Sequence, residues 1–387
     1  MLKMLIKRVL IIIVSAVVVS GAGAVYVYAE DKEDILSGCG AECIYVCELG
    51  SGQMICERNS GVKRPMGHIA KLMTVLICAE ELEKGSIRLA DEVTASAYAN
   101  SMPPPQIWLK QGDVVTVEEL LKSIIIGNAN DACVALCEKL SGSDKAHTER
   151  INKRASELGM KDTHFEDCCG LDIKTVSTAK DMCILSKCII KYDNLTEYFV
   201  TWMDNVKSQA VELVSQNRLI RTYKGAFGLK CCAGRQLGYD LAAVVKQGEM
   251  TICTVMFGED SKDRLFSTAS NILDTIFDKY RSFSPKIDED LLSNVAIVGG
   301  QKASVRVKAD NITGVLLRKG ESAKVGYKAS VPESVEAPVY EGEQLGSVVY
   351  SLGDKTIAEV KICAAEDVEK MDILFGIYKC LCNLFKL

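Results

Sequence analysis

The order of strand-like and helix-like segments restricts the folds that this chain can adopt. Residues 43–59 read as two short strands around Gly50-Ser51-Gly52, a pattern typical of a β-hairpin. Far along the chain, the apolar segments 239–245 and 250–257 are joined by a short turn and predict two adjacent antiparallel strands. Helical patterns fill the middle of the chain. Strands at both ends with helices between them predict an α/β (α+β) core around a central antiparallel sheet.

Three helices are expected in the middle of the chain. From Ile69 onward, apolar residues recur at the spacing of one helical face. Thr116 and Glu119 form a capping box ahead of an apolar run, which marks the start of a second helix. In a third, Cys133 and Cys137 lie on the apolar side, where we interpret them as small hydrophobic residues.

Residues 1–29 have the pattern of a secretory signal peptide. Basic residues precede a short apolar run, and Val27 and Ala29 fit the positions just before a signal-peptidase cut. A retained membrane helix is the alternative, but the run from Val9 to Val19 is short for a full membrane span. On either interpretation the body of the protein is exported.

The composition argues against nucleic acid as a partner and gives no simple disulfide framework. A net charge of −5 with 25% charged residues suits a soluble globular body and offers no basic surface for nucleic acid. The 17 cysteines are an odd number, and a chain of 387 residues can bury a core without disulfides. Cys39, Cys43 and Cys47 match no zinc pattern. We therefore expect no metal and no cofactor.

Two further segments with different sequence patterns follow in the C-terminal part of the chain. Residues 281–290 are polar and contain a proline, which indicates a domain boundary, and short strand-like runs split by glycine turns follow it. In the last segment, polar positions recur every three or four residues from Asp372 to Lys386 and the rest is mostly apolar. We predict an amphipathic helix at 366–387 that lies in a membrane interface; a helix docked on the β-rich domain is the alternative.

Together these pieces resemble the serine-type D-Ala-D-Ala carboxypeptidases of the peptidase S11 type, the low-molecular-weight penicillin-binding proteins. Segments similar to that family lie at 101–143, 155–172 and 337–350. The resemblance covers nearly the whole chain. It implies a β-lactamase/transpeptidase-like domain at 36–283, followed by a small all-β domain at 290–365.

In this family, chemistry depends on three motifs. A Ser and a Lys stand one helical turn apart in S-x-x-K, so that the lysine amine can take the proton from the attacking hydroxyl. S-x-N and K-T-G line the opposite walls of the cleft. The corresponding segments here read His68-Ile69-Ala70-Lys71, Asn128-Ala129-Asn130 and Lys230-Cys231-Cys232. The lysines and the second asparagine remain, but the attacking and proton-relaying hydroxyls are absent.

The resemblance assigns a role to each matching position. Lys71 stands where the family has its general base, and His68 stands at the nucleophile position. Asn128 replaces the serine of the second motif, and Asn130 is retained there. Lys230 and Cys231 occupy substrate-binding positions.

Our leading hypothesis is a catalytically silent relative of these carboxypeptidases, exported and attached to the outer face of the cytoplasmic membrane. It would bind peptidoglycan stem peptides or an unspecified protein partner through the old cleft. One alternative is an active but divergent D-Ala-D-Ala carboxypeptidase. Another is a repurposed site in which Cys231 and His68 face one another as a thiol–imidazole pair or as part of a zinc site.

Overall fold

A computed structural model describes residues 35–207, 210–234, 238–310, 314–373 and 375–377. The signal peptide predicted at residues 1–29 lies outside the described residues. The described chain divides into two compact units. The larger unit runs to Ser284 and also includes Gly314–Ala323, and the smaller unit contains the rest of the chain from Pro285 onward.

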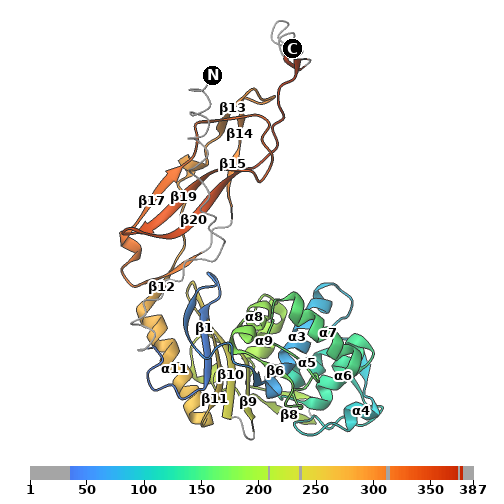
Figure 1. Ribbon diagram of the computed structural model, residues 1–387. Helices are drawn as coiled ribbons and strands as arrows, with labels where there is room; N and C mark the ends of the chain where they lie inside the picture. Colours follow the sequence, from blue (N-terminus) through green and yellow to red (C-terminus); the bar gives the residue numbers. More distant parts are fainter. Residues whose placement is uncertain (1–34, 208–209, 235–237, 311–313, 374, 378–387) are drawn as a thin grey trace, which may run out of the picture. The chain divides into compact units, whose positions relative to one another are not determined.

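The larger unit is built around one antiparallel sheet of five strands in the order β2-β1-β11-β10-β9 (Figure 1). The strands are β1 (Cys43–Glu48), β2 (Met54–Arg58), β9 (Ala226–Gly234), β10 (Gly238–Gln247) and β11 (Met250–Glu259). Both predicted strand pairs are present: β1 pairs with β2, and β10 pairs with β11. The mixed fold class with a central antiparallel sheet is therefore confirmed.

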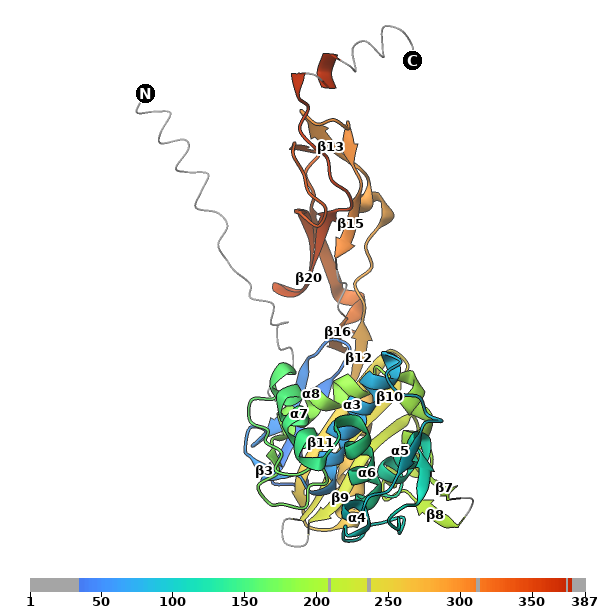
Figure 2. The ribbon, with the colours of Figure 1, turned by 90° about the vertical axis from the view of Figure 1, so that its right-hand side faces the viewer.

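Helices cover the two faces of this sheet, and alternate strand residues enter two separate cores. The helix α11 (Lys262–Lys279) lies on one face, whereas α3, α5, α6 and α8 gather on the other, where Figure 2 shows them in front of the strands. In β10, Leu241 and Ala243 join the core beneath α11. Ala242 and Val244 join the core beneath the other helices. This alternation follows from the two-residue period of a strand.

The helices begin where the sequence signals predict. α5 (Val117–Ile125) starts with a complete capping box, in which Thr116 accepts a hydrogen bond from the Glu119 N–H at 3.2 Å and the Glu119 carboxylate accepts one from the Thr116 N–H at 2.9 Å. The helix expected from Ile69 begins as a 3₁₀ turn, η1 (Gly67–Ala70), and continues as α3 (Lys71–Glu83). α6 (Asn130–Ser141) is the third predicted helix.

The remaining helices and strands of the larger unit complete the two layers and the loops around the sheet. They are β3 (Arg64–Pro65), β4 (Glu92–Thr94), α4 (Ala97–Asn100), β5 (Val114–Thr116), α7 (Asp144–Glu157), β6 (Val176–Ser177), α8 (Ala179–Ile189), η2 (Asp193–Leu195), α9 (Thr196–Val200), β7 (Met203–Val206), β8 (Val211–Val214), α10 (Leu219–Thr222), β12 (Tyr280–Phe283) and β16 (Val315–Arg318). β12 and β16 pair with each other, so a strand from beyond residue 290 belongs to the larger unit.

The smaller unit is β-rich, as the sequence predicts. One sheet has the order β15-β20-β19-β17 and another has the order β14-β13-β18. Their bounds are β13 (Val295–Val298), β14 (Ser304–Val305), β15 (Val307–Asp310), β17 (Val325–Ser330), β18 (Ser334–Glu336), β19 (Gln344–Leu352) and β20 (Lys355–Ala364).

The amphipathic helix predicted at 366–387 does not begin at residue 366. Val368 forms a β-bridge with Val339, and Lys370 forms one with Gly300, so this stretch continues the β-rich unit. Helical backbone appears only beyond these bridges, and residues 378–387 lie outside the described part of the chain. Within the described residues, none of the helices combines the length and the apolar character that crossing a membrane requires.

Asp131 ties the start of α6 to the loop that precedes β5. Its carboxylate is buried and accepts hydrogen bonds from the N–H groups of Ile107 at 3.1 Å and Leu109 at 2.9 Å. We expect Asp131→Ala to lower the free energy of unfolding by about 3 kcal/mol, because it leaves two buried N–H donors without an acceptor. Both tryptophans of the chain, Trp108 and Trp202, lie in the larger unit, so tryptophan fluorescence during urea unfolding measures this unit.

The matched control is Asp278→Ala, which removes an exposed carboxylate that pairs with Lys319. This variant should leave the unfolding midpoint nearly unchanged, because exposed ion pairs contribute little. Equal midpoints for the two variants would show that Asp131 does not anchor the loop.

Candidate active site

His68 and Lys71 form the centre of the site. They lie one turn apart, His68 in η1 and Lys71 at the first position of α3. The Lys71 side chain is fully buried, and its Nζ lies 2.8 Å from His68 Nδ1 and 3.3 Å from the Cys169 carbonyl oxygen. An ammonium group has only donors, so Nδ1 of His68 acts as the acceptor and carries no proton.

The imidazole of His68 is held in its neutral form. Burial, together with the positive charges of Lys71 and Lys230, lowers its pKa to about 3. With Nδ1 already accepting from Lys71, the ring is a weak base at neutral pH and its unprotonated nitrogen is occupied.

Lys230 reaches the same region from β9. Its side chain is 2% exposed, and its Nζ donates to the carbonyl oxygens of Ile124 and Ile125, the latter at 3.2 Å. These carbonyls belong to the end of α5, where the helix dipole favours a cation. Burial lowers the pKa of Lys230 to about 7, with the charge of Lys71 acting in the same direction.

Asn128 and Asn130 are the buried amides of the site. Asn128 has a φ of 58°, a left-handed conformation that asparagine tolerates better than most residues. Asn130 begins α6 and donates from Nδ2 to the Pro103 carbonyl at 2.7 Å. Within the described part of the chain, neither Oδ1 atom has a hydrogen-bond partner, although both atoms are buried. Two amide oxygens are therefore left with unused acceptor capacity.

The loop that carries Cys169 is pressed against η1. Gly170 has a φ of 72°, and a Cβ atom at this position would lie 1.8 Å from the Gly67 carbonyl oxygen, so only glycine fits. The Asp167 carboxylate accepts from the N–H of Cys169 at 2.7 Å and of Leu171 at 3.1 Å. These contacts place the Cys169 carbonyl beside the Lys71 ammonium group.

The structure does not bring Cys231 to His68. Cys231 pairs with Leu241 in the β9–β10 ladder and lies in the core beneath α11, on the opposite face of the sheet from Lys230. Burial raises the pKa of its thiol to about 11, so it is not a thiolate. Cys232, on the other face of the strand, has its Sγ 3.6 Å from the Met66 carbonyl oxygen next to η1. The predicted Cys231–His68 pair is therefore not formed.

Several groups of the site were not foreseen from the sequence. The acceptors for the two lysines are backbone carbonyls, of Cys169 for Lys71 and of Ile124 and Ile125 for Lys230, and a carbonyl has no signature in a sequence. The sequence held one signal for the loop that carries Cys169. Gly170 directly follows the two cysteines, and a glycine at such a place indicates a tight turn with a left-handed backbone conformation.

Comparison with protein-family models places the chain in a family. Residues 32–261 match the peptidase S11 model, described as D-alanyl-D-alanine carboxypeptidase. Residues 280–370 match the model of the C-terminal domain of penicillin-binding protein 5. The protein belongs to the peptidase S11 family of D-Ala-D-Ala carboxypeptidases.

Individual relatives agree with this membership. The chain is 31% identical over 335 residues to the D-alanyl-D-alanine carboxypeptidase DacF of Bacillus subtilis, covering 85% of this chain and 86% of that protein. It is 28% identical to DacC of Escherichia coli, covering 84% and 83% of the two chains. Penicillin-binding protein 5 of Haemophilus influenzae has the same fold, with a TM-score of 0.78, 24% identity and coverage of 86% of this chain and 98% of that one.

The low pKa of His68 makes a prediction about stability in mild acid. In the unfolded chain the ring titrates near its ordinary value of 6.5, whereas in the folded protein it titrates at about 3. Between these values only the unfolded state binds the proton, so the stability from this group falls as the pH drops from 6.5 toward 3. Urea unfolding at several pH values should show this loss, of at most about tenfold in the folding equilibrium constant per pH unit.

The matched variant is His68→Asn, which offers Lys71 an oxygen acceptor but does not titrate. The stability difference between parent and variant should shrink or reverse as the pH falls below 6.5. His147, whose pKa burial lowers to about 4, titrates in both proteins and cancels in this difference. Parallel pH profiles for the two proteins would show that His68 is not held neutral.

Proposed function

We propose that this protein is a catalytically silent member of its family that binds the D-Ala-D-Ala end of peptidoglycan stem peptides without cleaving it. The observation that carries the proposal is the surroundings of Lys71. Its hydrogen-bond partners are a neutral imidazole and a backbone carbonyl. The family resemblance assigns the nucleophile position to His68. A lysine base with no hydroxyl or thiol at the nucleophile position cannot start the family's acyl transfer.

His68 does not replace the lost serine as a nucleophile. A nitrogen with a pKa near 3 is a poor electron-pair donor, and Nδ1 already accepts a hydrogen bond from Lys71. The amide of D-alanine is in turn a poor electrophile. Removing the nucleophile of a catalytic set typically costs several orders of magnitude in rate.

Binding is supported by the unused acceptors and by the cations. Asn128 and Asn130 each bury an amide oxygen with no donor among the described residues, and each such orphan costs about 1–3 kcal/mol unless a ligand supplies an N–H group. A peptide supplies N–H donors and a terminal carboxylate. The carboxylate is the natural partner of the positive charge on Lys71 and Lys230.

The test is the intact mass of the protein before and after incubation with excess benzylpenicillin, together with a peptide ending in D-Ala-D-Ala. We expect an unchanged mass, no release of D-alanine and measurable binding of the intact peptide by calorimetry. Asn128→Ala should weaken this binding by about tenfold, because it removes an acceptor for the peptide N–H.

A variant that restores the family's motifs by His68→Ser, Asn128→Ser, Cys231→Thr and Cys232→Gly serves as the positive control for acylation. A covalent adduct on the parent, or release of D-alanine, would overturn the silent function. Either result would favour the second candidate, an active divergent carboxypeptidase, which the names of the relatives support.

We also propose that the protein is exported and attached to the outer face of the cytoplasmic membrane by its C-terminal segment. The signal-peptide pattern of residues 1–29 supports export. Attachment is supported by Ile373 and Ile377, which lie one helical turn apart and are 84% and 53% exposed. An exposed apolar pair at the start of an apolar segment suits a lipid interface.

Flotation with lipid vesicles tests this attachment. We expect a chain that starts at residue 30 to float with vesicles, because its apolar C-terminal segment enters the interface. The same chain ending at Met371 should stay in the soluble fraction, since it lacks that segment. Equal flotation of the two chains would exclude the C-terminal segment as the anchor.

A further inference from the structure

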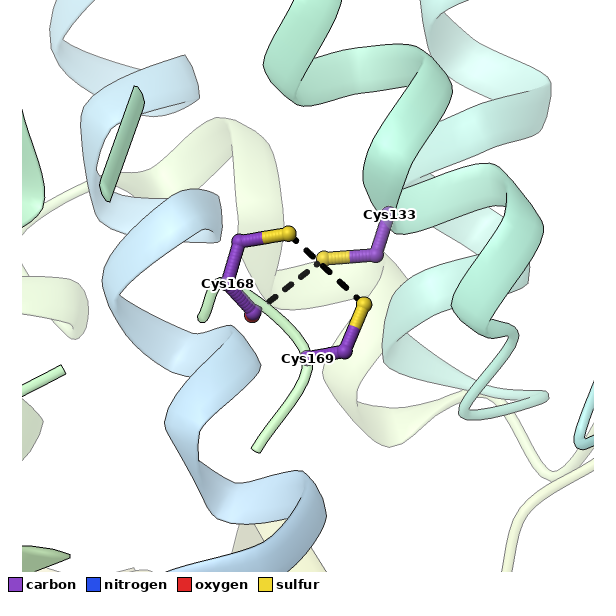
Figure 3. Close-up of side chains that lie close together, drawn as sticks. All are labelled: Cys133, Cys168 and Cys169. Atoms are coloured by element: carbon purple, nitrogen blue, oxygen red, sulfur yellow. Dashed lines mark hydrogen bonds between the residues drawn. The ribbon is translucent and has the colours of Figure 1, made fainter. Parts of the chain in front are cut away.

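Three cysteine sulfurs meet beside the lysine of the site. Cys133 comes from α6, and Cys168 and Cys169 come from the loop between α7 and β6 (Figure 3). Their Sγ atoms all lie within 4.8 Å of one another, and those of Cys168 and Cys169 are 3.6 Å apart. None of the three side chains is more than 1% exposed.

A fourth sulfur lies at the edge of this group. Cys137 follows Cys133 by one turn of α6 and is fully buried. Its Sγ lies within 4.8 Å of the Cys168 Sγ and of an Asp144 carboxylate oxygen, and Thr74 Oγ1 is 3.7 Å away. The four thiols, Cys133, Cys137, Cys168 and Cys169, form what we call the thiol cluster. Its members come from two segments that are more than thirty residues apart.

The two buried lysines of the site need negative charge in return. Within the described residues, the hydrogen-bond partners of their ammonium groups are His68 Nδ1 and the carbonyl oxygens of Cys169, Ile124 and Ile125, all uncharged. Buried charges are normally paired, because an unpaired one loses its hydration without compensation. The Cys169 residue whose carbonyl holds Lys71 also supplies a sulfur to the thiol cluster, so the lysine lies against the cluster itself.

We propose that the thiol cluster binds one Zn²⁺ ion, with Cys133, Cys168 and Cys169 as ligands and with the Cys137 thiol, which lies beside Cys168, drawn in as the fourth ligand. Zinc–sulfur bonds of about 2.3 Å in a tetrahedron place the sulfurs about 3.8 Å apart. This is close to the 3.6 Å between the Cys168 and Cys169 Sγ atoms, and it lies within the 4.8 Å that spans all three thiols. Four thiols release four protons as the ion binds, and no oxidation occurs. The resulting site carries two negative charges, which the ammonium groups of Lys71 and Lys230 balance.

This ion would act as a structural clamp. It joins the loop of Cys168 and Cys169 to α6, and so fixes the carbonyl that receives the Lys71 ammonium group. Because the cluster is buried, the ion would enter while the chain folds, as in other structural zinc sites. The proposal is independent of the silent function: a failed metal assay leaves the acylation result unaffected.

The experiment measures zinc in the full chain purified without oxygen, and then replaces zinc by Co²⁺. Elemental analysis should find one zinc per chain. The cobalt form should show sulfur-to-cobalt charge-transfer bands and the visible bands of a tetrahedral site. Cys133→Ala and Cys169→Ala should each weaken zinc binding, measured by competition with a chromophoric chelator, by at least about tenfold, since loss of even an outer hydrogen bond costs that much.

The matched control is Cys78→Ala, which removes a fully buried thiol of α3 that is not part of the thiol cluster. This variant should keep the zinc and the cobalt spectrum. A second group of thiols, in which the Cys47 and Cys183 Sγ atoms lie 2.7 Å apart, is the competing location. Cys183→Ala should therefore also keep the metal.

Three results would overturn the proposal. The first is a folded parent protein with no zinc and no cobalt–thiolate bands. The second is a disulfide between Cys133 and either loop cysteine in a non-reducing peptide map of the anaerobic protein. The third is zinc that survives Cys133→Ala and Cys169→Ala but is lost in Cys183→Ala. The cobalt spectrum of the parent decides the question even if a variant does not fold.

Discussion

The burial of two lysine ammonium groups, of Lys71 and Lys230, is the constraint on which the rest of the site depends. Moving an ammonium group out of water costs several kcal/mol unless donors and charges are satisfied. Each neighbouring element contributes to this satisfaction. The end of α5 turns its last carbonyls toward Lys230, and the loop before β6 brings the Cys169 carbonyl to Lys71. The close approach of Gly170 to Gly67 is the steric requirement for that second contact.

The parts of the fold that depend on local sequence were predicted well. The hairpin of β1 and β2, the pairing of β10 with β11 and the capping box at Thr116 each follow from residues within a few positions of one another. The start of the C-terminal helix was wrong for the opposite reason. The bridge between Val368 and Val339 joins distant segments, and no local pattern indicates it.

The site was predicted in part. The prediction that failed was that Cys231 faces His68, because it required knowing which residues of β9 point to which face of the sheet. Alternation correctly separates Cys231 from Cys232, but it does not say which of them faces η1. That choice depends on the pairing of Cys231 with Leu241, and Leu229, with a φ of 72°, interrupts the regular alternation just before it. The thiol cluster was missed because Cys133 and Cys168 are far apart in sequence. In the sequence, the helix-core spacing of Cys133 and Cys137 indicated small hydrophobic residues only.

Retention of Lys71 and Lys230 without a nucleophile has a physical explanation that does not need catalysis. A lysine beside a serine acts as a base only if it can lose its proton, whereas a lysine beside an anion is stabilised in its charged form. In the proposed silent function, His68 supplies neither a hydroxyl nor a charge, so the site has no use for a base. It has a use for cations if an anion is present, either the peptide carboxylate of the proposed function or the metal thiolate of the proposed zinc site. In both cases the same two charges serve binding or folding, which accounts for the loss of the hydroxyls while the lysines remain.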